Sequence, residues 1–191
     1  MVDYSKHGGY VDIVDSDNNP TGEVLPLKIA NKRKLFHRGA NVVLLTPDNH
    51  IYAQKRSKKQ FFMPSYIDVT LGGSCDPGET PEQAAVREMF EETGIRVAQK
   101  DLQFIDCHRE FVWRPSRRTH SCVFSYTYAV RLTEDYPDFV IQKEEADSMR
   151  RITLPQFKRL VKRGYLPGLG RLVTTRARYQ KVYDYLAKNM L

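Results

Sequence analysis

Apolar and polar residues alternate along this chain in two repeating patterns. Runs rich in β-branched and aromatic residues are typical of strands, and they cover 10–15, 23–27, 40–45, 51–56, 66–70, 102–113 and 121–132. The first two runs flank the turn SDNNPTG and predict an N-terminal β-hairpin. Helices are predicted at 28–34, 81–93, 155–163 and 171–189. This order predicts an α/β fold in which a mixed sheet lies between helices.

The helix expected between Thr80 and Gly94 carries clear start and stop signals. Thr80 suits the N-cap, Pro81 fits the first helical position, and Gln83 completes a capping box. Gly94 is the expected left-handed residue that ends the helix. Apolar residues recur at helical spacing between these signals: Ala84, Ala85, Val86, Met89 and Phe90.

The last turns of this helix gather negative charge. Glu88 and Glu92 are four residues apart and share a face, and Glu91 lies three residues beyond Glu88. Each like-charged pair costs roughly 0.2–0.5 kcal/mol, and carboxylates are disfavoured at a helix C-terminus. Arg87 can relieve Glu91, but nothing nearby in the sequence is expected to relieve Glu88 and Glu92. Taken alone, the three glutamates could also be a solvated helix face.

The segment before the helix favours a different interpretation. LGGSCDPGE (71–79) is rich in glycine and proline, so an irregular loop is expected there rather than a strand. A strand, a glycine loop and a capped helix would let backbone carbonyls approach the acidic helix face. Hard divalent cations prefer such a set of carboxylate, carbonyl and water oxygens. Mg2+ or Mn2+ between the glutamates would turn repulsion into coordination.

From Gly73 to Ile95 the residues run G-x5-E-x7-R-E-M-x-E-E-x-G-I. This resembles the complete Nudix box of the Nudix hydrolases, which cleave a diphosphate linked to another group, X, with Mg2+ or Mn2+. The resemblance implies a Nudix-type α/β/α sandwich with a mixed β-sheet. It also implies that Glu88, Glu91 and Glu92 bind metal together with the carbonyl of Gly72. Arg87 is then counted with the three glutamates as part of the catalytic set, where it orients the acidic cluster through a salt bridge to Glu79.

The resemblance predicts hydrolysis of a nucleoside-diphosphate-X type compound by attack of water on phosphorus. A carboxylate base would assist, and in the family its position varies. The glutamate at position 88 is one candidate, and candidates outside the box are Glu110, Glu144, Glu145 and His120. The residues leave this choice open.

Composition agrees with a single enzymatic domain over 1–191, with an N-terminal hairpin and a basic C-terminal helix. The chain has 191 residues, of which 41% are hydrophobic and 28% charged, as in globular proteins. Tyr179, Val182, Tyr183 and Leu186 form a stripe on the last helix that is expected to face the core. No transmembrane span or signal peptide is recognised. Three scattered cysteines indicate reduced thiols and a cytoplasmic setting.

The formal charge of +7 indicates a negatively charged binding partner. Basic residues can steer and bind a small phosphorylated substrate, and we assign this role to Arg56, Lys58 and Lys59 just before the box. Each of them could equally be a solvated surface residue. A protein that binds nucleotide or RNA without turnover is the alternative for the same charge. A homodimer is also left open.

One branch of the family resembles the chain in layout, namely the isopentenyl diphosphate isomerases and related hydrolases. The resemblance rests on LFHRGANVVLL and AQKRSKKQFFMPSYIDV ahead of the box. His37 matches one of two metal-binding histidines of the isomerases, but Ala30 stands at the other, and Gly72 stands where the isomerases have a catalytic cysteine. Cys75 could replace that cysteine only after a shift of the loop. These departures favour hydrolysis, with isomerisation as the alternative.

Overall fold

The fold is organised around β3 (Phe36–Leu45), the central strand of a mixed sheet. The computed structural model describes residues 9–60, 63–114, 119–134, 144, 146–173 and 176–189. β3 pairs in parallel with β8 (Thr119–Arg131) and antiparallel with β6 (Leu71–Ser74). β8 also pairs antiparallel with β7 (Gln103–Arg114). The parallel and antiparallel ladders together confirm the predicted mixed sheet.

Further strands extend the sheet from both ends of β3. β3 meets β1 near its start and β4 at its end, β1 pairs with β2, and β4 pairs with β5 and β9. β10 and β11 form a separate small ladder. The bounds of these strands are β1 Tyr10–Val14, β2 Pro20–Pro26, β4 Ile51–Arg56, β5 Ile67–Asp68, β9 Ala146–Ile152, β10 Tyr165–Leu166 and β11 Gly170–Arg171. The antiparallel β1–β2 pair confirms the predicted hairpin.

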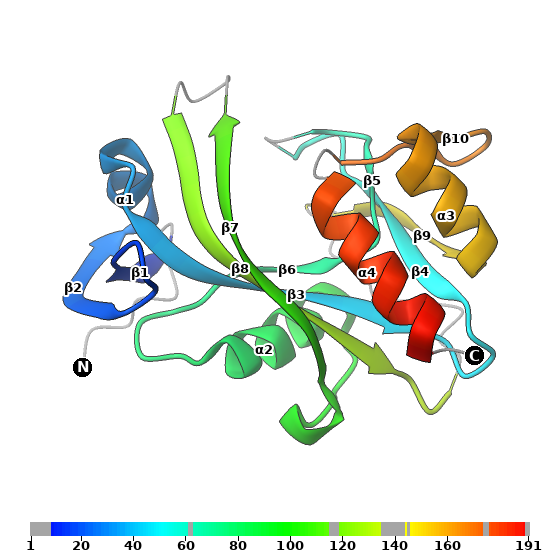
Figure 1. Ribbon diagram of the computed structural model, residues 1–191, viewed down its shortest axis with the longest axis horizontal. Coiled ribbons are helices and arrows are strands. Elements are labelled where there is room, and N and C mark those ends of the chain that lie inside the picture. Colours follow the sequence, from blue (N-terminus) through cyan, green and yellow to red (C-terminus); the bar gives the residue numbers. More distant parts are fainter. Residues whose placement is uncertain are drawn as a thin grey trace.

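Helices cover both faces of the sheet (Figure 1). α2 (Pro81–Thr93) packs on one face, and α3 (Leu154–Arg163) and α4 (Arg176–Asn189) pack together on the other. α1 (Leu27–Arg33) lies beside the β1–β2 hairpin, and η2 (Gln99–Asp101) is a short 3-10 turn after α2. This arrangement confirms the predicted α/β/α sandwich. None of the helices in the described part of the chain has the length and hydropathy needed to cross a lipid bilayer.

Alternation along β3 builds a separate core on each face, since successive side chains of a strand point to opposite sides. Val42 and Leu44 pack with Met89 of α2, whereas Val43 packs with Phe157 of α3 and other residues beneath α4. The predicted stripe on α4 is confirmed, with Tyr179, Val182 and Leu186 buried and Tyr183 packed against the same core. Both faces of the sheet therefore contribute to stability.

α2 begins and ends where its signals predict. The Thr80 hydroxyl accepts from the backbone N–H of Gln83 at 3.3 Å, and the Gln83 side chain accepts from the N–H of Thr80 at 2.8 Å. The helix ends at Gly94, which adopts the left-handed conformation. Of the apolar residues at helical spacing, Phe90 is 38% exposed and lies beneath the guanidinium of Arg96.

Several predicted boundaries are wrong. The segment after β5 is not wholly irregular, because Leu71–Ser74 forms β6 by pairing with β3. The predicted strand at 66–70 is reduced to Ile67–Asp68, and the N-terminal turn is shorter than SDNNPTG because β2 starts at Pro20. The last helix starts at Arg176 rather than at 171, because Gly170–Arg171 pairs with β10. Pairing with the distant strand β3 makes β6 a strand, whereas local pairing with β1 and β10 decides the boundaries of β2 and α4.

The packing around α3 predicts a large loss of stability for Phe157→Ala. Phe157 is fully buried, and its ring meets the rings of Tyr179 and Tyr183 edge-on. Removing a buried aromatic ring leaves a cavity, so the free energy of unfolding should fall by about 3–5 kcal/mol. Phe104, which is 54% exposed on β7, provides the control, and Phe104→Ala should cost about 1 kcal/mol or less. Denaturant titrations of both variants measure the difference, and equal losses would contradict this assignment of the core.

Candidate metal centre

The acidic end of α2 lies directly against the glycine strand β6. The backbone N–H of Gly72 donates a hydrogen bond to Oε1 of Glu92 at 2.8 Å, and Glu92 is only 9% exposed. Glu88, one turn earlier, is also largely shielded, with 16% of its side chain exposed, whereas 49% of the Glu91 side chain is exposed. The structure therefore brings two of the three glutamates to the same short strand.

This close approach requires glycine at two consecutive positions. Gly72 has φ of +147°, and a Cβ there would overlap with the carbonyl oxygen of Ala40 in the neighbouring strand. A Cβ at Gly73 would overlap with the carboxylate of Glu88. A side chain at Gly72 would push β3 away from β6, whereas one at Gly73 would displace the Glu88 carboxylate from the strand. The two glycines thus determine how closely the glutamates approach the backbone.

Arg87 distributes its charge over the surrounding carboxylates. Its guanidinium binds Glu79 through two hydrogen bonds of 3.0 and 2.9 Å, and Nη1 also binds Glu88 at 2.9 Å and Glu91 at 3.3 Å. Nη2 donates to the carbonyl of Ser74 at 3.0 Å. The predicted Arg87–Glu79 salt bridge is present, as is the predicted Arg87–Glu91 pair. The expectation that nothing nearby relieves Glu88 is wrong, because Arg87 reaches its immediate neighbour.

Burial affects the ionisation of groups in this cluster. Burial raises the pKa of Glu88, and the charge and hydrogen bond of Arg87 only partly offset this effect. Burial, with a further contribution from Glu79, also raises the pKa of the Cys75 thiol to about 12. Cys75 is therefore a protonated, buried thiol, which fits a structural role better than that of a nucleophile.

The donor set fits a hard divalent cation. Glu88 and Glu92 supply carboxylate oxygens, and they lie against the backbone of Gly73 and Gly72 respectively, where there is no intervening side chain. Within the described residues, no three His, Cys, Asp or Glu side chains already surround a common point as metal ligands. A cation would compete with Arg87 for Glu88 and Glu91, because Arg87 binds both of them.

The candidates for a base outside the box fall in different places. Glu110 lies on β7, where it accepts a hydrogen bond from His108 at 2.7 Å and lies 3.6 Å from the guanidinium of Arg178. Burial opposes ionisation of Glu110, but His108 and Arg178 outweigh it and lower its pKa. His120 lies on β8 against the ring of Phe111. The side chain of Glu144 is exposed, and Glu145 lies outside the described residues.

The predicted substrate-binding residues follow β4. Arg56, at its end, donates to the Gln60 side chain at 3.0 Å and lies 3.8 Å from Asp68. Lys58 and Lys59 are exposed in the turn that follows. These contacts locate the three residues, and their role toward phosphate stays a prediction.

The sequence did not predict the largely buried polar cluster on the face covered by α4, although Glu110 was by itself a candidate base. Its members are Asn41, Asp68, Thr70, Glu110 and Arg178, and the last of these is 9% exposed. A signal was present, since Asn41 opens the apolar run of β3 and Arg178 stands next to the apolar stripe of α4. A single polar residue at such a position is easily mistaken for a surface residue.

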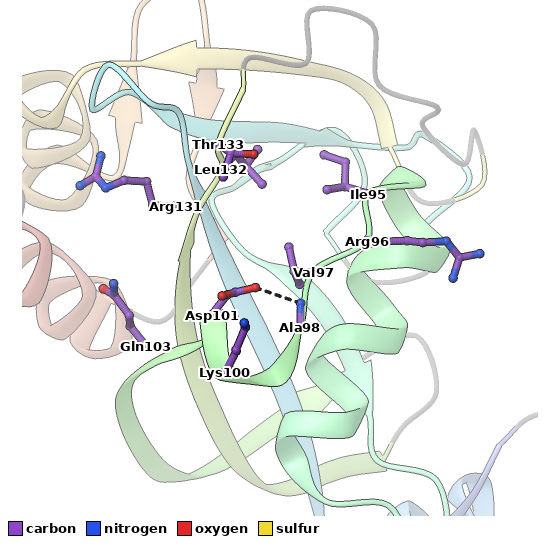
Figure 2. Close-up of a pocket in the computed structure, with 10 residues that line it drawn as sticks. All are labelled: Ile95, Arg96, Val97, Ala98, Lys100, Asp101, Gln103, Arg131, Leu132 and Thr133. Atoms are coloured by element: carbon purple, nitrogen blue, oxygen red, sulfur yellow. Dashed lines mark hydrogen bonds between the residues drawn. The ribbon is translucent and has the colours of Figure 1, made fainter.

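A cavity of about 460 Å³ lies beyond the C-terminal end of α2 (Figure 2). It is lined by residues of 95–103 and 131–133, and the described lining includes none of the predicted site residues. The guanidinium groups of Arg96 and Arg131 point outward from the cavity (Figure 2). The Arg131 guanidinium instead donates to Asn49 of the β3–β4 turn. This cavity is therefore distinct from the candidate metal centre.

Comparison with known proteins gives a consistent result. The family model of the NUDIX domain matches residues 35–168, well over half of the chain. The chain is 34% identical over 124 residues to an uncharacterised Nudix hydrolase, orf19, of Rhodococcus erythropolis, covering 62% of this chain and 66% of that protein. It is 32% identical over 140 residues to a prenyl-diphosphate phosphatase of Methanosarcina mazei, and this match covers 71% of this chain and 76% of that protein. The match therefore spans slightly less than two thirds of the length of the Rhodococcus protein.

Solved structures share the fold at lower sequence identity. The structure of DR0079 from Deinococcus radiodurans superposes with a TM-score of 0.63 at 17% identity, covering 94% of this chain and 98% of that one. At this identity the likeness concerns the fold alone. It extends beyond residues 35–168 and so includes elements that flank the region of the family match.

The raised pKa of Glu88 predicts how stability depends on pH in the metal-free protein. A carboxyl whose pKa is raised on folding holds its proton more tightly in the folded state, so stability declines as pH rises from the ordinary value of 4.5 through the raised one. Glu88→Gln lacks this titration. The unfolding free energy of the variant, relative to wild type, should therefore increase across that interval and level off above it.

Glu82→Gln is the matched control on the same helix. Burial opposes ionisation of Glu82, but hydrogen bonds from the Tyr128 hydroxyl at 2.7 Å, from the backbone and from Thr80 together outweigh burial and lower the pKa. A lowered carboxyl pKa gives the opposite sign, so this variant should lose relative stability as pH rises toward the ordinary carboxyl pKa. Denaturant unfolding in the presence of a chelator, at a series of pH values, measures the stability of both variants relative to wild type. The same pH dependence in Glu88→Gln and Glu82→Gln would contradict the opposite pKa shifts assigned to the two residues.

Proposed function

Because the chain belongs to the Nudix hydrolase family, we propose that it is a metal-dependent pyrophosphohydrolase acting on a nucleoside-diphosphate-X type compound. The observation that carries the proposal is the meeting of Glu88 and Glu92 with the glycine pair of β6. Glu91 completes the acidic set on a more exposed side of the same helix, which Met89 anchors in the core. The substrate would be a small phosphorylated molecule, as is general for this family.

In the proposed reaction the chain holds the ion and orients the reacting groups. Glu88, Glu91, Glu92 and the carbonyl of Gly72 would bind Mg2+, for which Mn2+ could substitute. The ion would neutralise phosphoryl oxygens and lower the pKa of a bound water. Arg87 belongs to the same catalytic set, since it holds Glu79 and Glu88 in fixed positions.

A carboxylate base would accept the proton of the attacking water. Glu88 and Glu110 are the described candidates that lie in polar, largely buried surroundings. The lowered pKa of Glu110 keeps it ionised and able to accept a proton, but makes it a weaker base. The activities of Glu88→Gln and Glu110→Gln would distinguish the two candidates.

Arg56, Lys58 and Lys59 are proposed to pair with the phosphate oxygens of the substrate. Arg56 is the strongest of the three, because a guanidinium can bind two phosphate oxygens at once. Its present neighbours Gln60 and Asp68 would hold it in a defined position. The two exposed lysines would add long-range attraction that weakens with salt.

Two classes of compound are favoured as substrates and should be tested first. Nucleoside-diphosphate-X compounds follow from the family, and prenyl diphosphates follow from the 32% identity to the Methanosarcina mazei phosphatase. An isomerase is less favoured, because Cys75 is buried with a raised pKa and Gly72 replaces the isomerase cysteine. Binding of nucleotide or RNA without turnover remains the alternative if no substrate is cleaved.

We further propose that residues 1–191 form one Nudix domain and that the protein works in the cytoplasm. The β1–β2 hairpin continues the sheet through β3, and α4 closes one of its cores, so both termini of the described region belong to the same unit. All three cysteines are free thiols, which supports a reducing compartment. The domain could act as a monomer or as a homodimer.

Glu92→Gln is expected to abolish most of the hydrolytic activity. The substitution removes a carboxylate ligand while keeping the size of the side chain, so kcat should fall by roughly 100-fold or more with the fold intact. Phosphate release from a confirmed substrate, measured in Mg2+, in Mn2+ and with a chelator, tests this. The chelator should stop turnover by the wild-type protein.

Glu82→Gln is again the control, because Gln can still accept from the Tyr128 hydroxyl and the residue lies outside the acidic cluster. It should keep near-normal turnover. Near-normal turnover by Glu92→Gln, with its fold confirmed by circular dichroism, would refute the metal assignment.

Incubation with isopentenyl diphosphate in D2O distinguishes hydrolysis from isomerisation. Isomerisation moves a proton between carbons and leaves the diphosphate intact, whereas hydrolysis releases phosphate or diphosphate and leaves the carbon skeleton unlabelled. We expect no deuterium in the carbon chain under conditions in which a diphosphate bond of some substrate is cut. Deuterium incorporation that disappears in Cys75→Ala would overturn the hydrolase assignment.

A further inference from the structure

A buried arginine on α4 stands beside the apolar stripe that packs this helix against the sheet. Tyr179, Val182 and Leu186 are each at most 1% exposed and already anchor α4 in the core. Arg178, immediately before Tyr179, is nevertheless also buried, at 9% exposed. Removing a guanidinium from water is unfavourable unless its surroundings compensate the charge. Its position therefore indicates a role beyond docking.

The guanidinium of Arg178 joins oxygens from several elements. It donates to the Tyr179 hydroxyl at 2.7 Å, to Thr70 Oγ1 at 3.4 Å and to Asn41 Oδ1 at 3.5 Å. The carboxylates of Glu110 and Asp68 lie 3.6 and 3.9 Å away and balance its charge. β3, β5 and β7 and the segment before β6 thus converge on one side chain.

Two of these partners flank Gly72, the glycine that binds Glu92. Asn41 is the direct partner of Gly72 in the β3–β6 ladder, and Thr70 precedes Gly72 by two residues in the chain. Thr70 is fixed again by Asp68, whose Oδ1 accepts from both the N–H and the hydroxyl of Thr70 at 2.9 and 2.7 Å. A shift at either partner would be transmitted to Gly72, since the backbone packs there without space for a Cβ.

We propose that Arg178 is a positioning residue for the candidate metal centre. By holding Asn41 and Thr70 from the α4 side of the sheet, it fixes the backbone of Gly72, whose N–H orients Glu92 on the α2 side. Among the described residues, the contacts of Arg178 include none of the glutamates of the box. The inference rests on the proposed function, because it assigns Gly72 and Glu92 to a metal site.

Lys181 provides the matched control. It stands three residues after Arg178 on the same helix and also forms an ion pair with β7, through Asp106 at 2.8 Å. Its contacts do not include Asn41, Thr70 or any residue of β6 among those described. Lys181→Met therefore removes an α4–β7 contact without touching the connection to Gly72.

The experiment follows Mn2+ binding to metal-free protein by electron paramagnetic resonance. Arg178→Met should weaken Mn2+ binding by about tenfold, as loss of a residue that orients metal ligands typically does, and Lys181→Met should bind as wild type. The Gly72 amide should exchange with solvent faster in Arg178→Met only. In turnover assays kcat should fall in Arg178→Met with a smaller change in KM for the substrate.

Arg178→Lys keeps the test decisive if Arg178→Met fails to fold. Lysine preserves the charge opposite Asp68 and Glu110 but lacks the fork that reaches Asn41 and Thr70 together. We expect a folded protein with a wild-type melting temperature and Mn2+ binding weakened by about threefold, below the range seen for complete loss of an orienting residue. Wild-type Mn2+ binding and Gly72 exchange in a folded Arg178 variant would overturn the proposal.

The proposed function is tested separately in the same titration. Wild-type protein should bind Mn2+ and Glu92→Gln should bind it more weakly. If that difference is seen but the Arg178 variants match wild type, positioning by Arg178 is refuted and the metal centre stands. If wild type and Glu92→Gln both fail to bind Mn2+, the metal centre is refuted, and the role of Arg178 falls with it.

Discussion

The close approach of α2 to β6 is the constraint on which the rest of the site depends. A hydrogen bond from the Gly72 N–H to Glu92 and the contact of Glu88 with Gly73 both require backbone without side chains at those positions. The capping box at Thr80 sets where the helix starts, and Met89 sets which face meets the sheet. The position and rotation of the helix therefore determine which glutamates reach the strand.

Arg87 explains how a cluster of like charges is tolerated at a helix C-terminus. Its bonds to Glu79, Glu88 and Glu91 neutralise part of the repulsion and fix the direction of each carboxylate. Burial still raises the pKa of Glu88, so the cluster carries an electrostatic cost in the folded protein. Coordination to a divalent ion would relieve that cost, which links the stability of this region to its proposed function.

The opposite face of the sheet contributes through polar contacts as well as through its core. Aromatic and aliphatic side chains of α3 and α4 bury that face, and Arg178 introduces one guanidinium among strands that are far apart in sequence. Because β3 contributes to both faces and is paired directly with β6, groups beneath α4 can affect the geometry beneath α2. The sheet is thus the mechanical connection between the two helical layers.

The sequence by itself determined the local features of this protein. Thr80, Pro81 and Gly94 predict the bounds of α2, and the box residues predict the family, because capping and ligand spacing act over only a few residues. The hairpin at β1–β2, the apolar stripe of α4 and the mixed α/β order were also predictable from periodicity. These features depend on interactions between residues that are close in the chain.

Only the tertiary structure decided the features that depend on distant partners. Gly72 and Gly73 belong to a strand because β3 is beside them. Arg178, Asn41 and Thr70 meet although 137 and 108 residues separate the arginine from the other two. Pattern and propensity describe neighbours along the chain, whereas strand pairing and buried polar contacts are selected by the packing of the whole fold.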